Sequence, residues 1–171
     1  DGNTDGVRFT GLEPGGFSGA SVAGVGDVNN DGFDDILIGS YLAGADNEGA
    51  ATLVQGSATL SGTISLAQFG STYRGQTAND LAGISVGSAG DVNGDNVDDF
   101  IVGAYRFDQE GAQNVGASYV VYGDEEGIGG TTLDDAAGFT IVGEQRNSYS
   151  GFTVNSAGDV KADGFADLLI G

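Results

Sequence analysis

Short apolar runs of about four to six residues recur along the chain, separated by stretches rich in Gly, Asp, Asn and Ser. Runs of this length between turn-forming residues are typical of buried β-strands and are too short for ordinary helices. Glycine accounts for 33 of the 171 residues, so a helix is hard to place anywhere in the chain. The pattern therefore predicts an all-β protein.

The expected strands fall into groups. In each group a first strand leads into an acidic segment, a second follows it, a third ends at Gly, and a fourth precedes the next group. Units of four short antiparallel strands are the plan of a β-propeller blade. The expected strands cover residues 21–25, 36–39, 51–54 and 72–74, then 85–88, 100–103, 117–122 and 139–142, with 9–10 before the first group and 168–171 in the third.

The acidic segment occurs three times, at residues 27–35, 91–99 and 159–167, with its first Asp 64 and then 68 residues apart. Other landmarks keep the same spacing, which indicates internal duplication. The landmarks are Gly11, Gly75 and Gly143; Phe17, Leu81 and Tyr149; Gly19, Gly83 and Gly151; and Val22, Val86 and Val154.

The duplication divides the chain into two complete repeats, residues 7–70 and 71–136, and a shorter third, residues 137–171. A closed propeller needs roughly four to eight blades. We therefore expect the chain to be a segment of a longer propeller, or to be completed by neighbouring copies of itself.

Each acidic segment carries oxygen-bearing side chains at alternate positions, which is what a hard cation requires. The first segment would supply ligands from positions 1, 3, 5, 7 and 9: Asp27, Asn29, Asp31, the backbone carbonyl of Phe33, and Asp35. Gly32 at position 6 allows a sharp turn. A set made only of oxygens favours Ca²⁺ over Mg²⁺, which demands tighter octahedral geometry.

The second segment keeps the whole ligand set: Asp91, Asn93, Asp95, the carbonyl of Val97, and Asp99. Asn96 replaces the Gly at position 6. Asn tolerates a left-handed backbone better than most residues, so we expect the turn to be kept.

The third segment departs from this pattern, because Lys161 occupies position 3 and an ammonium group offers no acceptor. Either water fills the gap and the affinity for the ion falls, or the lysine charge replaces the ion. The remaining candidate ligands are Asp159, Asp163, the carbonyl of Phe165, and Asp167. An alternative for all three segments is a metal-free turn, since Asp, Asn and Gly are ordinary turn residues. The repetition of positions 1, 5 and 9 argues against it.

The segments are not EF-hands, which need Glu at position 12, where this chain has Ile38, Val102 and Ile170. Instead the chain resembles the FG-GAP repeats of integrin α-subunit propellers and their bacterial relatives. Phe17-Ser18-Gly19 stands where that family has its Phe-Gly pair, and Gly39-Ser40-Tyr41 and Gly103-Ala104-Tyr105 stand at its Gly-Ala-Pro. The resemblance implies four-stranded blades, each with Ca²⁺ in the loop between its first two strands.

The net charge of −20, from 25 acidic and 5 basic residues, makes nucleic acid an unsuitable partner, because phosphate binding needs a basic surface. The chain has no Cys and no His, which excludes Ser-His-Asp, Cys-His and His/Cys zinc chemistry. Glycosidase-like carboxylate pairs remain possible in principle, but no pair of glutamates stands out. We therefore expect a protein that is not an enzyme, with a carbohydrate-active domain as the weakest alternative.

No signal peptide or transmembrane run is present in the sequence. Calcium sites of millimolar affinity are typical of extracellular modules, so we expect a secreted or surface-exposed protein. The leading hypothesis is a calcium-stabilised module in cell adhesion that binds a protein or glycan ligand. A subunit of a calcium-stabilised filament or matrix is the alternative.

Overall fold

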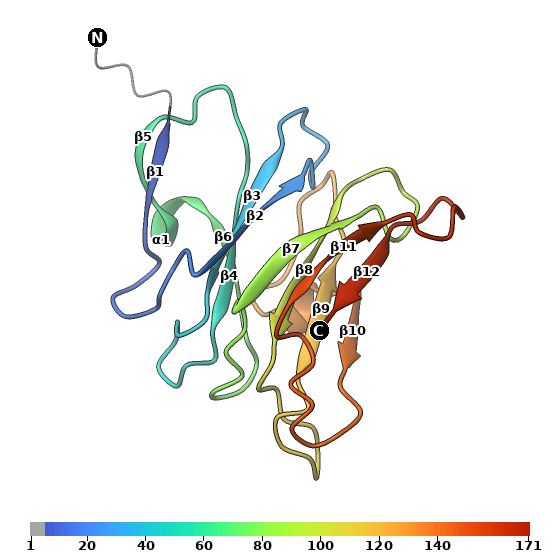
Figure 1. The fold of residues 1–171 in the computed structure, drawn as a ribbon. Helices are drawn as coiled ribbons and strands as arrows, with labels where there is room; N and C mark the ends of the chain where they lie inside the picture. Colours follow the sequence, from blue (N-terminus) through green and yellow to red (C-terminus); the bar gives the residue numbers. More distant parts are fainter. Residues whose placement is uncertain (1–5) are drawn as a thin grey trace.

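The computed structural model describes residues 6–171, which form an all-β protein with two four-residue helices (Figure 1). The strands are β1 (Val7–Thr10), β2 (Ser21–Gly26), β3 (Asp35–Ser40), β4 (Ala50–Val54), β5 (Gly62–Ser65), β6 (Ser71–Arg74), β7 (Ser85–Gly90), β8 (Asp99–Ala104), β9 (Ala117–Val121), β10 (Phe139–Val142), β11 (Val154–Gly158) and β12 (Asp167–Ile170). The helices are α1 (Leu66–Phe69) and α2 (Leu133–Ala136).

Two sheets of four antiparallel strands make the first and second blades, in the orders β2-β3-β4-β6 and β7-β8-β9-β10. A third sheet pairs β11 with β12, the counterparts of the first two strands of a blade. The expected all-β architecture of four-stranded propeller blades is therefore confirmed. The repeat boundaries 7–70, 71–136 and 137–171 stay a prediction, because a repeat in sequence can begin at a different strand from a blade in space.

Two of the three hydrophobic clusters lie between consecutive blades, and the third packs Ile38 and Val54 of the first blade against Leu66 of α1. Between the first two blades, Leu37 and Tyr73 meet Phe100 and Tyr119, and all four side chains are almost completely buried. The rings of Tyr73 and Phe100 lie 6.0 Å apart. A smaller cluster that includes Ile101 and Val154 joins the second blade to the third sheet. Consecutive blades thus bury apolar side chains against each other.

Two glycine landmarks allow this close stacking. A Cβ at Gly39 would overlap the carbonyl oxygen of Gly83 in the next blade, and one at Gly103 would overlap that of Gly151. Gly83 has φ +82° and its N–H donates to the carbonyl of Gly103, within its own blade. The repeated glycines are therefore contact points between blades, where any side chain would force the sheets apart.

The two short helices and β5 were not among the expected elements, because the sequence pattern predicted no helix and no strand between residues 54 and 72. Each helix is one turn held by a single buried leucine, Leu66 or Leu133, so it lacks the apolar periodicity that reveals longer helices. β5 pairs with β1 in parallel. A similar parallel pairing joins β6 to the segment before α2, through a bridge between Arg74 and Thr132. There the Arg74 N–H donates to the carbonyl of Thr131 at 3.0 Å. Neither helix of the described chain is long and apolar enough to cross a membrane.

Candidate metal centres in three acidic hairpin loops

The three acidic segments form the hairpin loops between the first two strands of each sheet, as the sequence predicts. Loop 1 (residues 27–35) joins β2 to β3, loop 2 (91–99) joins β7 to β8, and loop 3 (159–167) joins β11 to β12. In Figure 1 all three lie at the upper end of the molecule. A bulge precedes each loop, at the register shifts Gly24/Gly26, Ser88/Gly90 and Ser156/Gly158. Such a bulge bends the strand and turns the loop out of the sheet.

The first aspartate of each loop organises the backbone around itself. In loop 1, Asp27 Oδ1 accepts a hydrogen bond from the Asp31 N–H at 3.0 Å, and its Oδ2 accepts one from the Gly32 N–H at 2.8 Å. Asp91 and Asp159 accept the same pair of bonds in loops 2 and 3. Asp27 and Asp159 keep a further lone pair on each oxygen, whereas Asp91 Oδ1 also accepts the Gly94 N–H at 2.6 Å, so in loop 2 the free lone pair of this residue lies on Oδ2.

The turn at position 6 is left-handed in all three loops. Gly32 and Gly164 have φ +91° and +92°, and Asn96 has φ +69°. The expectation that Asn96 keeps the turn is confirmed. Position 4 is also left-handed, and there loop 3 carries Ala162 at φ +54°, a conformation that costs an alanine about 1–2 kcal/mol.

The closing aspartates of loops 1 and 2 are fully buried. Asp35 accepts hydrogen bonds from the N–H groups of Val28 and Gly56, and Asp99 accepts them from Val92 and Gly123. Gly56 and Gly123 follow the third strand of each blade, so that strand delivers the second donor. Burial, together with the smaller effect of the neighbouring loop aspartates, raises the pKa of both carboxyl groups above the ordinary value, to about 6 for Asp99.

Loop 3 is arranged differently around Lys161. The ammonium group lies 2.8 Å from Asp167 Oδ1 and 3.3 Å from Asp163 Oδ2, so it bridges two of the four candidate ligands. These contacts hold the pKa of Asp167 below its ordinary value and raise that of Lys161. Asn29 and Asn93, the counterparts of Lys161, instead donate to Asp31 and Asp95 and keep a carbonyl oxygen that accepts a loop N–H.

The donor chemistry of loops 1 and 2 fits a hard cation, since carboxylate, amide and backbone carbonyl oxygens are the ligands that Ca²⁺ takes. Within residues 6–171, no three acidic side chains converge closely enough to hold an ion by themselves. An ion in loop 1 or 2 would therefore need the Asn and carbonyl oxygens as well. In loop 3 the position 3 oxygen is missing and a positive charge contacts the ligands.

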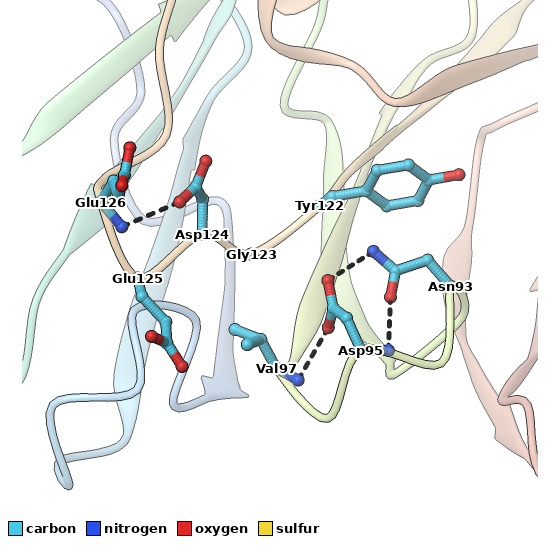
Figure 2. Close-up of a pocket in the computed structure, with 8 residues that line it drawn as sticks. All are labelled: Asn93, Asp95, Val97, Tyr122, Gly123, Asp124, Glu125 and Glu126. Atoms are coloured by element: carbon cyan, nitrogen blue, oxygen red, sulfur yellow. Dashed lines mark hydrogen bonds between the residues drawn. The ribbon is translucent and has the colours of Figure 1, made fainter.

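An open hollow of about 540 Å³ adjoins loop 2 (Figure 2). Asn93 and Asp95 lie on one side of it, and the segment Asp124–Glu126, which follows β9, lies on the other. The Val97 and Glu126 N–H groups are both bonded to nearby carboxylates, those of Asp95 and Asp124. The hollow is lined by acids, so it adds negative potential beside the candidate ligands.

The structure adds residues that sequence reasoning did not select. Asp98 of loop 2 reaches the first loop, where its Oδ2 accepts a hydrogen bond from the Asp27 N–H at 3.1 Å. Glu125 also contacts loop 1 through Asn30, with a distance of 2.6 Å between Nδ2 and Oε1. The sequence signals neither contact, because each joins residues far apart in the chain.

Comparison with known proteins agrees with this geometry. Residues 18–54 and 82–121 match the family model described as the FG-GAP repeat. These segments contain the whole of loops 1 and 2, whereas loop 3 lies outside them. Each matched segment begins near the first strand of a blade and ends with or near its third.

Three similar proteins are integrin α chains. The chain is 32% identical to integrin alpha-8 of Mus musculus over 96% of its own length, and 31% identical to integrin alpha-5 of Xenopus laevis over 62%. It is 30% identical to integrin alpha pat-2 of Caenorhabditis briggsae over 52%. It spans 15%, 10% and 7% of the lengths of these three relatives. The repeated loop, the glycine contacts between blades and these matches together show that the chain belongs to the FG-GAP repeat family.

Proposed function

We propose that this chain is a calcium-binding extracellular module that presents a rigid propeller surface to a protein or glycan ligand in cell adhesion. The observation that carries the calcium assignment is the pair of loops with the same oxygen donors, the same left-handed turn and the same buried closing aspartate. Similarity to integrin α chains supports the adhesion role. The role of the ion in this proposal is structural rather than catalytic.

The residues that would hold the ions are Asp27, Asn29, Asp31, Phe33 and Asp35 in loop 1, and Asp91, Asn93, Asp95, Val97 and Asp99 in loop 2, with Phe33 and Val97 acting through their carbonyls. Each of these loops contains four aspartates and no base. Their carboxylates repel one another, and a bound divalent cation would supply the compensating charge. Asp35 and Asp99 are the central residues, because they tie the loop to the end of the third strand.

Stability would then depend on calcium. Ions that bind the folded loops and not the unfolded chain stabilise the fold by mass action. The loops lie beside the contact between the first two blades, where Val25 and Val28 belong to the same core as Phe100. Ordering the loops therefore helps to hold the blades in register.

In loop 3, Lys161 would take over part of the role of the cation by pairing with Asp163 and Asp167. We assign this loop no ion in the native chain, and Asp159, Asp163, Phe165 and Asp167 remain its latent ligands. The proposed stoichiometry is thus two Ca²⁺ per chain.

The test is to measure thermal unfolding in calcium and in EGTA, together with the stoichiometry by isothermal titration calorimetry. We expect a higher Tm in calcium and two ions per chain, with one ion lost in Asp31→Ala and one in Asp95→Ala. A Tm that EGTA does not change, with no calcium found by elemental analysis, would refute the proposal. Ligands should be sought on arrays of glycans and matrix proteins, where binding that needs calcium supports the adhesion role and enzymatic turnover of a glycan contradicts it.

A further inference from the structure

Asp98 joins the two candidate calcium sites across the boundary between blades. It lies between Val97 and Asp99, two candidate ligands of loop 2, yet its side chain points away from that loop. Its Oδ2 accepts a hydrogen bond from the N–H of Asp27, the first candidate ligand of loop 1, at 3.1 Å. One residue thus belongs to one loop by its backbone and to the other by its carboxylate.

The neighbouring backbone is shaped to admit this carboxylate. Gly26, directly before Asp27, has φ +78°, and a Cβ there would overlap the Asp98 carboxyl group. The contact is also supported nearby, because the Asp124 N–H of the second blade donates to the carbonyl of Val28 at 2.9 Å. The start of loop 1 is therefore held by the second blade at two successive residues.

The same junction between the second blade and the third sheet lacks the carboxylate. There Ala166 takes the place of Asp98, against Gly90. The Ala166 N–H donates to the carbonyl of Asp91 at 2.8 Å, and the Phe165 ring lies against Gly94, so a backbone hydrogen bond and apolar contacts join these two loops and no carboxylate does. The chain therefore contains its own comparison: one junction has the side-chain bond and the other does not.

We propose that Asp98 is a positioning residue that couples calcium binding in loop 2 to calcium binding in loop 1. Fixing Val97 and Asp99 in loop 2 fixes the residue between them, and the Asp98 carboxylate then holds the Asp27 amide in the position that aims the Asp27 side chain into loop 1. Because coupling between two binding sites is reciprocal, an ion in loop 1 should strengthen binding in loop 2 by the same factor. This inference rests on the proposed calcium sites.

The experiment titrates calcium into the ¹⁵N-labelled chain and follows the amide signals of Gly32 and Asn96, which report on loops 1 and 2 separately. The variants are Asp98→Ala, Asp95→Ala, which removes a loop 2 ligand, and the double variant. We expect each single substitution to weaken calcium binding in loop 1 about fivefold, the lower end of typical coupling between sites. The double variant should show no further loss in loop 1.

Two controls separate the hydrogen bond from the charge. Asp98→Asn keeps an oxygen that can accept from the Asp27 N–H, so it should retain the dependence of loop 1 on Asp95. Asp34→Ala removes the equivalent charge from loop 1 itself, and in that variant loop 1 should still respond to Asp95→Ala. Ala166 shows that alanine fits at this position, and circular dichroism would confirm that Asp98→Ala is folded.

Equal loop 1 affinities in the wild type and Asp98→Ala would overturn the coupling while leaving the calcium sites in place. The coupling would also be overturned if Asp95→Ala weakened calcium binding in loop 1 as much in the Asp98→Ala background as in the wild type. If neither loop of the wild type responds to calcium, the proposed function itself fails, and the coupling fails with it.

Discussion

Replacing Lys161 by Asn should convert loop 3 into a third calcium site. The substitution restores the residue that loops 1 and 2 carry at position 3 and removes the ammonium group that contacts Asp163 and Asp167. The other oxygen donors and the left-handed turn at Gly164 are already in place. The change therefore removes one positive charge and adds one amide oxygen in a loop that otherwise follows the repeat.

The expected size follows from the exposure of Lys161 and from mass action. The lysine side chain is 65% exposed, so its ion pairs are screened by water and their loss should cost little stability in EGTA. In calcium at about one hundred times the dissociation constant, a new site stabilises the fold by about 2.7 kcal/mol. For a chain of this length that corresponds to a rise in Tm of about 5–10 °C.

The assay compares the calcium-induced rise in Tm of the wild type, Lys161→Asn and Lys161→Met, alongside the stoichiometry from calorimetry. The Met variant loses the charge but adds no acceptor, so it should bind two ions like the wild type, whereas Lys161→Asn should bind three. A wild type that already binds three ions would refute the reasoning, because Lys161 would then not exclude the ion. A Lys161→Asn chain that still binds two would refute it as well.

Three further substitutions test the fold of the loops and blades. Ala162→Gly should stabilise the chain by about 0.5–1 kcal/mol in urea unfolding, because it relieves the left-handed alanine; a loss of stability would contradict the assigned strain. Asp80 is buried, and burial raises its pKa above 3.8 in the folded chain. The protonated carboxyl group therefore contributes fully to the free energy of unfolding below pH 3.8, and this contribution is lost as the pH rises through the pKa of the folded chain. Asp80→Asn should therefore gain Tm relative to the wild type between pH 4 and 7 in EGTA, and a constant difference would count against burial as the cause. Gly103→Ala should cost about 1–3 kcal/mol, because the new methyl group would meet the carbonyl of Gly151; an unchanged urea midpoint would show that the blades can move apart.

The strands and the loops were predictable because their causes are local. The apolar runs that became β3, β4, β8 and β9 stand between turn residues and are buried along nearly their whole length, as short runs of this kind indicate. Many hydrogen bonds within the loops join residues at most seven positions apart, such as Asp27 with Gly32 and Val28 with Asp35. A pattern of Asp, Asn and Gly over nine residues therefore specifies most of the loop shape.

The sequence alone also determined that the unit repeats, since the glycine, aromatic and valine landmarks keep their spacing. It did not show why the glycines recur. The structure shows that Gly39 and Gly103 receive the carbonyl of the next blade, a contact between residues more than forty positions apart. Likewise, the parallel pairing of β1 with β5 joins segments that carry no matching signal in sequence.

Only the tertiary structure decided how the three loops differ in their surroundings. Asp35 and Asp99 are buried because the end of the third strand donates to them, whereas Asp167 pairs with Lys161. Asp98 reaches Asp27 across 71 residues because consecutive blades stack in register. Local sequence determines the oxygen donors within each loop. The stacking of blades determines which carboxylates are buried and which loops contact each other. These long-range contacts could not be predicted, because they produce no repeating pattern in the sequence.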